Sequence, residues 1–224
     1  MTSAATTGEL LERLARNDKR RGLIEELNRL KESAGTPSAG RVAIILGQWF
    51  HPLHYFPAFL SRLISVAPNV EVQAEIAKIL WQELGEGDYR RAHEVIYIDT
   101  MVNVGFAAEQ VSKAPPLEHT EKLVAGYQQA SAGFLSGLGF MYATEVADLA
   151  MVSAIGQLVR ECTGQHDLPW IDIHVNQEPE HVQSSTQTLL PPFTTKEQQQ
   201  IVASAEEMWA LWTHFFGGIR QAIS

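Results

Sequence analysis

Apolar side chains recur at intervals of three and four residues along most of this chain, which is the spacing of amphipathic helices. From residue 8 to residue 34 they are interleaved with many Arg, Lys and Glu side chains, so we expect a helix on the outside of the molecule. The Gly-, Pro- and Ser-containing segment 35–40 follows and has the composition of a linker. Residues 1–40 are therefore expected to form a peripheral helix and a linker.

The next two helical patterns are separated from their neighbours by turn-forming residues. The pattern over residues 41–66 contains Pro57, which should kink the helix or start a new one. The pattern over residues 70–84 ends at the sequence Gly-Glu-Gly-Asp, residues 85–88. Its two glycines end one helix, and its aspartate can cap the next, which carries His93.

Residues 117–162 predict two long helices, hinged near the glycines at 133, 137 and 139. The second of them is apolar on nearly every side. A helix of this kind is usually buried in the centre of its domain. We therefore expect this segment to form the middle of the fold.

The last third of the chain continues the helical pattern. A loop over residues 163–169 precedes a helix that begins near Trp170, and Thr194 with Glu197 forms a capping box for the last helix. The sequence contains no extended alternation of the kind that predicts strands. We expect an all-α fold of about seven or eight helices, with residues 1–224 as a single domain.

Composition and charge narrow the possible functions. Hydrophobic residues make up 45% of the chain and charged residues 19%, which is sufficient for a sizeable core, and the net charge of −9 disfavours nucleic-acid binding. With Cys162 as its one cysteine the chain forms no internal disulfide, so we expect a reducing, cytoplasmic location. We find no run of about 18 apolar residues and no secretory signal at Met1–Thr7. No membrane association is expected.

Three side chains that can bind metals follow one another on the helix near Trp170. His174, Glu178 and His181 are spaced at i, i+4 and i+7, so they point to one side of the helix. The alternative interpretation is an ordinary solvent-exposed face. Pro179 lies between two of them, and we expect residues 170–185 to be irregular or displaced in the absence of metal.

Other candidates for the same site come from the earlier helices. Glu145 lies in the apolar helix, where an ionised carboxylate requires a metal, a proton or a partner such as an arginine. Glu83 and His93 are ten residues apart and would share a face only if the break between them changed the chain direction. Glu86, seven residues before His93, is the rival carboxylate.

Glu83, His93, Glu145, His174, Glu178 and His181 together provide three carboxylates and three imidazoles. Mixed oxygen and nitrogen ligands favour iron or manganese over structural zinc, for which cysteine thiolates are common ligands. His51 and His54 lie among aromatic residues, and we interpret them as hydrogen-bonded histidines of the core or of a pocket.

The order of these residues resembles the haem-oxygenase-like di-iron oxidases and oxygenases, and so does the stretch Phe56-Pro57-Ala58-Phe59-Leu60. The resemblance covers roughly residues 45–185. It implies a haem-oxygenase-like fold without haem, and iron ligation by the six residues named above. It also implies two Fe(II) ions, O2 as co-substrate and, where the reaction requires one, an external reductant. Glu178 stands where this family usually has Asp.

Such enzymes oxidise small molecules, often amino acids or fatty acids, by N-oxygenation, desaturation or C–C cleavage. The substrate-pocket residues we expect are His51, His54, Tyr55, Tyr142 and Trp170. By analogy with such folds, a homodimer is plausible. Two alternatives stay open: a cofactor-independent oxidase or thiaminase-like enzyme of the same fold, and a non-enzymatic helical interaction module. The module would leave a buried Glu145 unexplained.

Overall fold

The structure is a computed structural model that describes residues 7–34 and 37–224, and all regular structure in these ranges is helical. The all-α prediction is thereby confirmed. The long helices are α2 (Asp18–Ala34), α3 (Ala39–Val66), α4 (Val70–Glu83), α5 (His93–Asn103), α7 (Glu118–Ala130), α8 (Phe134–Thr163), α9 (Pro169–Gln187) and α10 (Thr195–Ala222). The shorter elements are α1 (Thr7–Ala15), α6 (Ala108–Ser112) and a 3-10 helix (Tyr89–Arg91).

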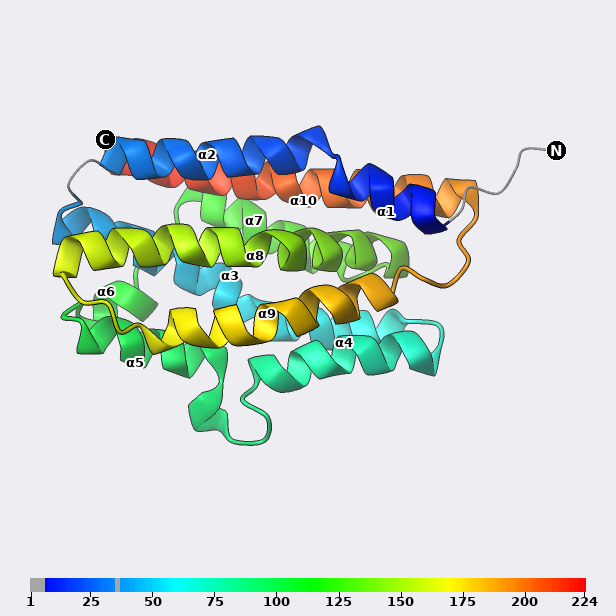
Figure 1. Cartoon of the computed structure of the whole chain (residues 1–224), viewed down its shortest axis with the longest axis horizontal. Coiled ribbons are helices and arrows are strands. Elements are labelled where there is room, and N and C mark those ends of the chain that lie inside the picture. Colours follow the sequence, from blue (N-terminus) through cyan, green and yellow to red (C-terminus); the bar gives the residue numbers. More distant parts are fainter. Residues whose placement is uncertain (1–6, 35–36) are drawn as a thin grey trace.

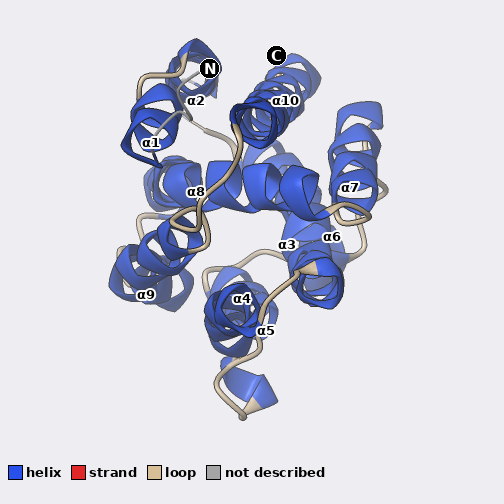
Figure 2. Cartoon of the chain, turned by 90° about the vertical axis from the view of Figure 1, so that its right-hand side faces the viewer, coloured by secondary structure: helices blue, strands red, loops and turns tan. Residues whose placement is uncertain are grey.

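Helix α8 occupies the centre of the molecule, as its apolar sequence predicts. It packs against α10 and α2 on one side and against α9 and α3 on another (Figures 1 and 2). By length and composition alone α8 could cross a membrane, but 72% of its most apolar 18-residue window is buried in this structure. Its apolar surface is therefore accounted for by packing in the core.

The N-terminal segment differs from the single peripheral helix that we expected. Helix α1 ends at Ala15. The side chain of Asn17 then caps α2 by accepting a hydrogen bond from the amide of Lys19 (2.9 Å). Helix α2 buries Leu23, Leu27 and other leucines against α8 and α10. This helix is therefore part of the core on one side. Residues 35 and 36 of the expected linker lie outside the described residues.

Helix α3 continues through Pro52 and Pro57, so Pro57 does not begin a new helix. The residues around it, including Phe56, Phe59 and Leu60, are buried in the core. Packing of this face stabilises the helical conformation although the prolines remove backbone donors.

The expected hinge between α7 and α8 lies at Gly133 alone, because Gly137 and Gly139 are inside α8. Both allow close approach of a neighbouring helix. A Cβ on Gly139 would lie 2.5 Å from the carbonyl oxygen of Ile201 in α10. Gly139 therefore permits the tight crossing of α8 and α10.

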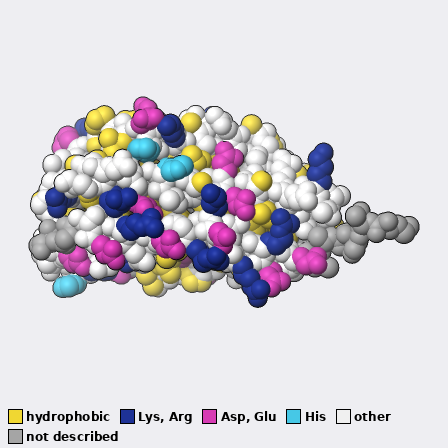
Figure 3. Space-filling view, turned by 90° about the horizontal axis from the view of Figure 1, so that it is seen from above, with side chains coloured by type: hydrophobic (Ala, Val, Ile, Leu, Met, Phe, Trp, Pro, Cys, Tyr) yellow, Lys and Arg dark blue, Asp and Glu magenta, His cyan; other side chains and the backbone are white. Residues whose placement is uncertain are grey.

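Acidic and basic side chains alternate over the face formed by α1, α2 and α10 (Figure 3). Several are paired along α2 and its surroundings: Arg21 with Asp18, Arg29 with Glu25, and Arg220 with the buried Glu26 (2.7 Å). This face therefore carries no uniformly basic surface among the described residues.

Candidate metal centre

A left-handed turn brings Glu83 and His93 to the same place. Glu83 ends α4 and His93 begins α5, and the intervening residues Gly85, Glu86 and Gly87 have φ values of 82°, 56° and 92°. At Gly85 a Cβ would collide with the backbone of the 3-10 segment, so only glycine fits. The turn joins the two helices so that both side chains meet α9, His93 at Gln177 and Glu83 at His181.

The rival carboxylate, Glu86, lies outside this cluster. Its Oε2 atom is 2.9 Å from Arg91 on the surface, whereas the Glu83 side chain is 7% exposed. The Oε2 atom of Glu83 is 3.2 Å from Nδ1 of His93, which is fully buried. Of the two carboxylates, the structure places Glu83 beside His93.

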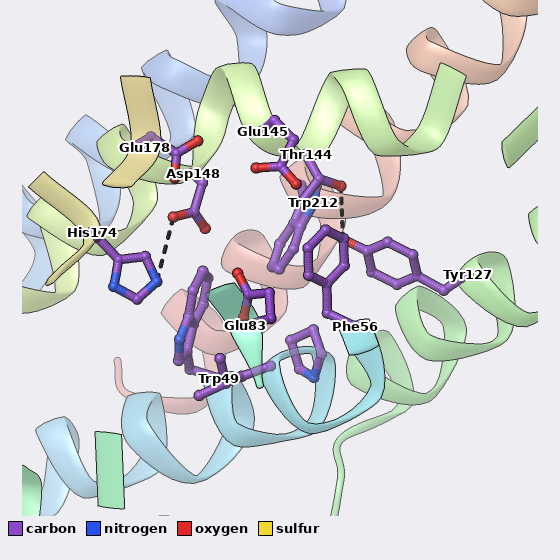
Figure 4. A pocket seen from close by; sticks show the side chains of 12 residues that line it. Trp49, Phe56, Glu83, Tyr127, Thr144, Glu145, Asp148, His174, Glu178 and Trp212 are labelled. Atoms are coloured by element: carbon purple, nitrogen blue, oxygen red, sulfur yellow. Dashed lines mark hydrogen bonds and ion pairs between the residues drawn. The ribbon is translucent and has the colours of Figure 1, made fainter. Parts of the chain in front are cut away.

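Glu145 projects from α8 into the same region and is 2% exposed. Its Oε2 atom is 3.4 Å from Nδ1 of His181. The alternative of an ion pair with an arginine is not found in the described part of the chain. Asp148 lies three residues later, on the same side of α8 (Figure 4).

Helix α9 contributes His174, Glu178 and His181, which are 4%, 3% and 1% exposed. The solvent-exposed alternative for these three side chains is therefore wrong. The expected irregularity of residues 170–185 is also wrong, because α9 is continuous through them. Pro179 and Val175 both lie on the exposed face of α9. Proline has no amide hydrogen, so the carbonyl of Val175 loses its usual helical hydrogen bond on that face only. The buried face can therefore pack undisturbed.

The six side chains predicted from the sequence thus lie together, and the distances among them are short. The Nδ1 atom of His181 is within 4.0 Å of oxygen atoms from three helices: 3.4 Å from Glu145, 3.8 Å from Glu83 and 4.0 Å from Glu178. The rings of His93 and His174 have centroids 4.7 Å apart. Four helices, α4, α5, α8 and α9, enclose this cluster.

Hydrogen bonds fix which imidazole nitrogens face the cluster. The Nε2 atom of His93 donates to Oε1 of Gln177 (2.8 Å), which leaves Nδ1 facing Glu83. The Nδ1 atom of His174 donates to the carbonyl oxygen of Trp170 (2.7 Å), which leaves the Nε2 lone pair facing inward. Metal-binding histidines are commonly held in this way by a hydrogen bond to the second nitrogen.

Mutual charge effects perturb the acidities of these groups. Burial would raise the pKa of Glu83, but the neighbouring histidines, His93 above all, lower it to about 2. Burial and the proximity of His93 lower the pKa of His174 to about 3. Burial, together with the charge of Asp148, raises the pKa of Glu178 far above its usual range. Such opposed shifts are typical of functional sites.

The residues fit a bound metal. Buried atoms without a hydrogen-bond partner include Glu145 Oε1, Asp148 Oδ2, Glu178 Oε1 and His181 Nε2. Leaving one such atom unsatisfied costs about 1–3 kcal/mol. Ligand atoms of Glu145, Glu178 and His181 all lie within 4.8 Å of one another. Two ligands that share an ion, each about 2.1 Å from it, lie about 3–4 Å apart. A cation would therefore satisfy this group.

A cavity adjoins the cluster, and its other walls are mostly aromatic and aliphatic (Figure 4). Helix α3 supplies Trp49, Pro52, Leu53 and Phe56. Tyr127, Thr144 and Trp212 complete the lining, and the hydroxyl groups of Tyr127 and Thr144 share a hydrogen bond of 2.7 Å. The spacing of the α3 residues, i, i+3, i+4 and i+7, is a signal that could have identified this wall from the sequence.

The five pocket residues expected from the sequence do not line this cavity, and that expectation is corrected. His51 donates to the carbonyl of Ala114, and the exposed His54 pairs with Glu94. Tyr55 and Tyr142 are likewise absent from the lining. Trp170 is fully buried behind the cluster and packs edge-on against His174. His51, His54 and Tyr55 also belong to α3, but they lie on a different side of this helix from the cavity-lining residues that begin at Trp49.

Asp148 was not among the residues predicted for the site, but the structure places it there. The carboxyl groups of Asp148 and Glu178 share a hydrogen bond, and burial raises the pKa of Asp148 to about 7. The signal in the sequence was a second acid three residues after Glu145 in an otherwise apolar helix.

We expect divalent metal to bind more tightly as the pH rises. Burial alone would lower the pKa of His181, but Glu145 and the other carboxylates raise it to about 9. Because His181 and Glu178 both hold protons near neutral pH, metal must displace them, and affinity should change by about tenfold per pH unit for each proton released. Anaerobic calorimetry between pH 6 and 8 measures this slope. An affinity independent of pH would contradict the prediction.

Comparisons with known proteins agree with this geometry. The family model described as "iron-containing redox enzyme" matches residues 44–213. The chain is 23% identical over 216 residues to a 4-chloro-allylglycine synthase from Streptantibioticus cattleyicolor, covering 94% of this chain and 82% of that protein.

Among solved structures, a CADD-like protein of unknown function from Nostoc punctiforme superposes with a TM-score of 0.80 at 18% identity, covering 97% of both chains. A domain of unknown function with a haem-oxygenase-like fold, from Shewanella denitrificans, gives 0.70 at 15% identity and covers 96% of this chain and 88% of that one. The expected haem-oxygenase-like fold is thus confirmed. Because the family model covers most of the chain, this protein belongs to the family of iron-containing redox enzymes.

Proposed function

We propose that this protein is a non-haem di-iron oxidase or oxygenase that uses O2 to oxidise an amino-acid-derived small molecule. The observation that carries the proposal is the enclosed cluster of carboxylates and imidazoles from α4, α5, α8 and α9. Within it, oxygen atoms from three helices surround one nitrogen of His181. Such a ligand set suits iron, and paired carboxylates can serve two ions.

When bound, two Fe(II) ions would supply the redox chemistry that activates O2. Glu83, Glu145 and Glu178 would hold them together with His93, His174 and His181. Gln177 and the carbonyl of Trp170 orient two of these imidazoles through hydrogen bonds. The apolar wall formed by α3 excludes water from the same volume, which protects a reactive centre from side reactions.

The cavity also bears on the substrate. Its lining consists of the aromatic and aliphatic residues named above, Thr144, and the acids and His174 of the cluster. No lysine or arginine is among these lining residues. The aromatic wall is therefore suited to an aliphatic segment of the substrate. The similarity to a 4-chloro-allylglycine synthase supports an amino-acid-derived substrate. The single cysteine, Cys162, is consistent with a cytoplasmic enzyme.

The test is anaerobic reconstitution with Fe(II), followed by exposure to O2. We expect the proposed site to bind about two iron ions per chain and to give a transient visible absorption band after mixing with O2. A panel of free amino acids and fatty acids, each with and without ascorbate as reductant, is then screened for O2-dependent loss of the compound. Mass spectrometry of the products distinguishes N-oxygenation, desaturation and C–C cleavage.

The other outcomes select the alternatives. Turnover that persists in the presence of a chelator, without iron uptake, would indicate a cofactor-independent enzyme of the same fold. Absence of both iron uptake and turnover would favour a helical interaction module, and the di-iron proposal would be abandoned.

A further inference from the structure

Asp148 lies at the edge of the cluster, between α8 and α9, and faces His174. Its Oδ2 atom is 3.7 Å from Nε2 of His174, and a dashed line marks this pair in Figure 4. The side chain is 15% exposed, but Oδ2 itself is buried and has no hydrogen-bond partner. A buried carboxylate oxygen without a donor requires an explanation.

Hydrogen bonding of His174 shows that no N–H reaches Asp148. Because Nδ1 of His174 donates to the carbonyl oxygen of Trp170 (2.7 Å), Nε2 of the neutral ring carries a lone pair. A lone pair and a carboxylate oxygen thus face each other at 3.7 Å, which is too long for a hydrogen bond. It is within the separation of about 3–4 Å for two ligands of one cation.

Glu178 adds a second carboxylate at the same point. Its side chain shares a hydrogen bond with Asp148, and its Oε1 atom is buried without a partner. The Nε2 atom of His174 and the carboxyl groups of Asp148 and Glu178 therefore line the same cavity. Two of these three side chains are more than nine-tenths buried.

The charge of the whole cluster supports the same assignment. Glu83, Glu145 and Glu178 alone provide three negative charges, so two divalent cations would leave one uncompensated positive charge. With Asp148 the ligand set carries four negative charges and balances both cations. Because an uncompensated charge is costly in a buried site, the fourth carboxylate favours binding of the second ion.

We propose that Asp148 is a seventh metal-binding side chain, which shares with His174 and Glu178 one of two cations in the site. This inference rests on the proposed di-iron function and adds a residue to its ligand set.

The test compares Asp148→Asn with wild type in anaerobic Fe(II) titrations. Asparagine keeps the size of the side chain and can still hydrogen-bond to Glu178, but it removes the charge. We expect the first ion to bind as in wild type and the second at least about tenfold more weakly. Glu161→Gln, an exposed acid on the same helix, makes the same charge change and should bind both ions as wild type does.

Melting curves separate a ligand from a structural partner. A ligand imposes a buried charge on the metal-free protein, so metal-free Asp148→Asn should melt at or above the temperature of wild type. The rise in melting temperature on adding Fe(II) should be smaller than in wild type. Asp148→Glu, which keeps the charge, should retain more of the second ion than Asp148→Asn does.

Three results would overturn the inference: unchanged binding of the second ion in Asp148→Asn, equal binding by the Asn and Glu variants, or a metal-free Asn variant that melts well below wild type. The last would make Asp148 a structural partner of Glu178 only. If wild type itself binds no iron, the proposed function fails instead. The two failures are thus distinguishable.

Discussion

Replacing Glu83 by glutamine is expected to weaken iron binding by at least about 100-fold and to abolish O2-dependent activity. The side chain contacts His93 at 3.2 Å and His181 at 3.8 Å and is 7% exposed. Its charge is therefore available to a cation and poorly screened by water. Glutamine has nearly the same shape, so the loss would reflect the missing charge rather than a cavity.

The matched control is Glu86→Gln, three residues later in the same turn. Glu86 faces Arg91 at the surface, and removing an exposed pair of this kind costs about 0–1 kcal/mol. We expect normal iron binding and activity from this variant. Equal losses in both variants would show that the turn as a whole matters, and normal iron binding in Glu83→Gln would remove Glu83 from the ligand set. Anaerobic titration and O2 consumption measure both.

Replacing Gly139 by alanine is expected to destabilise the fold by about 3 kcal/mol, which lowers the melting temperature by roughly 6–12 °C in a domain of this size. The added Cβ would lie 2.5 Å from the carbonyl oxygen of Ile201 and 2.9 Å from the amide nitrogen of Ala205. Both are backbone atoms of α10, so relief requires the helices to separate. Helix α10 carries Trp212, and such a shift would also disturb the cavity wall.

Gly22→Ala is the control for the helix propensity of alanine. Gly22 is inside α2, and a Cβ there has no atom within 4 Å. Alanine should stabilise the helix by about 1 kcal/mol, and the melting temperature should rise by roughly 2–4 °C. The two glycine substitutions should therefore have opposite signs in a thermal melt of the metal-free protein. A Gly139→Ala variant as stable as wild type would contradict the tight crossing of α8 and α10.

The helices were the part of the fold most accessible from the sequence. The three-four spacing of apolar residues identified α10, because such a stripe has to be buried against a neighbouring helix, and α8 was identified as central because it is apolar on nearly every side. Proline was a less reliable guide. Pro57 and Pro179 lie inside continuous helices, because packing of the buried face outweighs the loss of single backbone hydrogen bonds.

The candidate site was predictable where residue type and context coincided. Glu145 was conspicuous because a carboxylate in an apolar helix requires a partner, and His174, Glu178 and His181 because their spacing gives them one face. The sequence left Glu83 and Glu86 as alternatives. Their choice depends on the direction in which the turn at residues 85–87 leaves α4, and its left-handed backbone is visible only in three dimensions.

The sequence by itself determined the class of fold and the residue types that can bind iron, since both depend on local periodicity and on side-chain chemistry. Only the tertiary structure decided which side chains meet. It brought Asp148 opposite His174 and placed Trp49 and Trp212 beside the cluster. These contacts join residues from different helices, and they depend on how closely the helices cross, which no local pattern specifies.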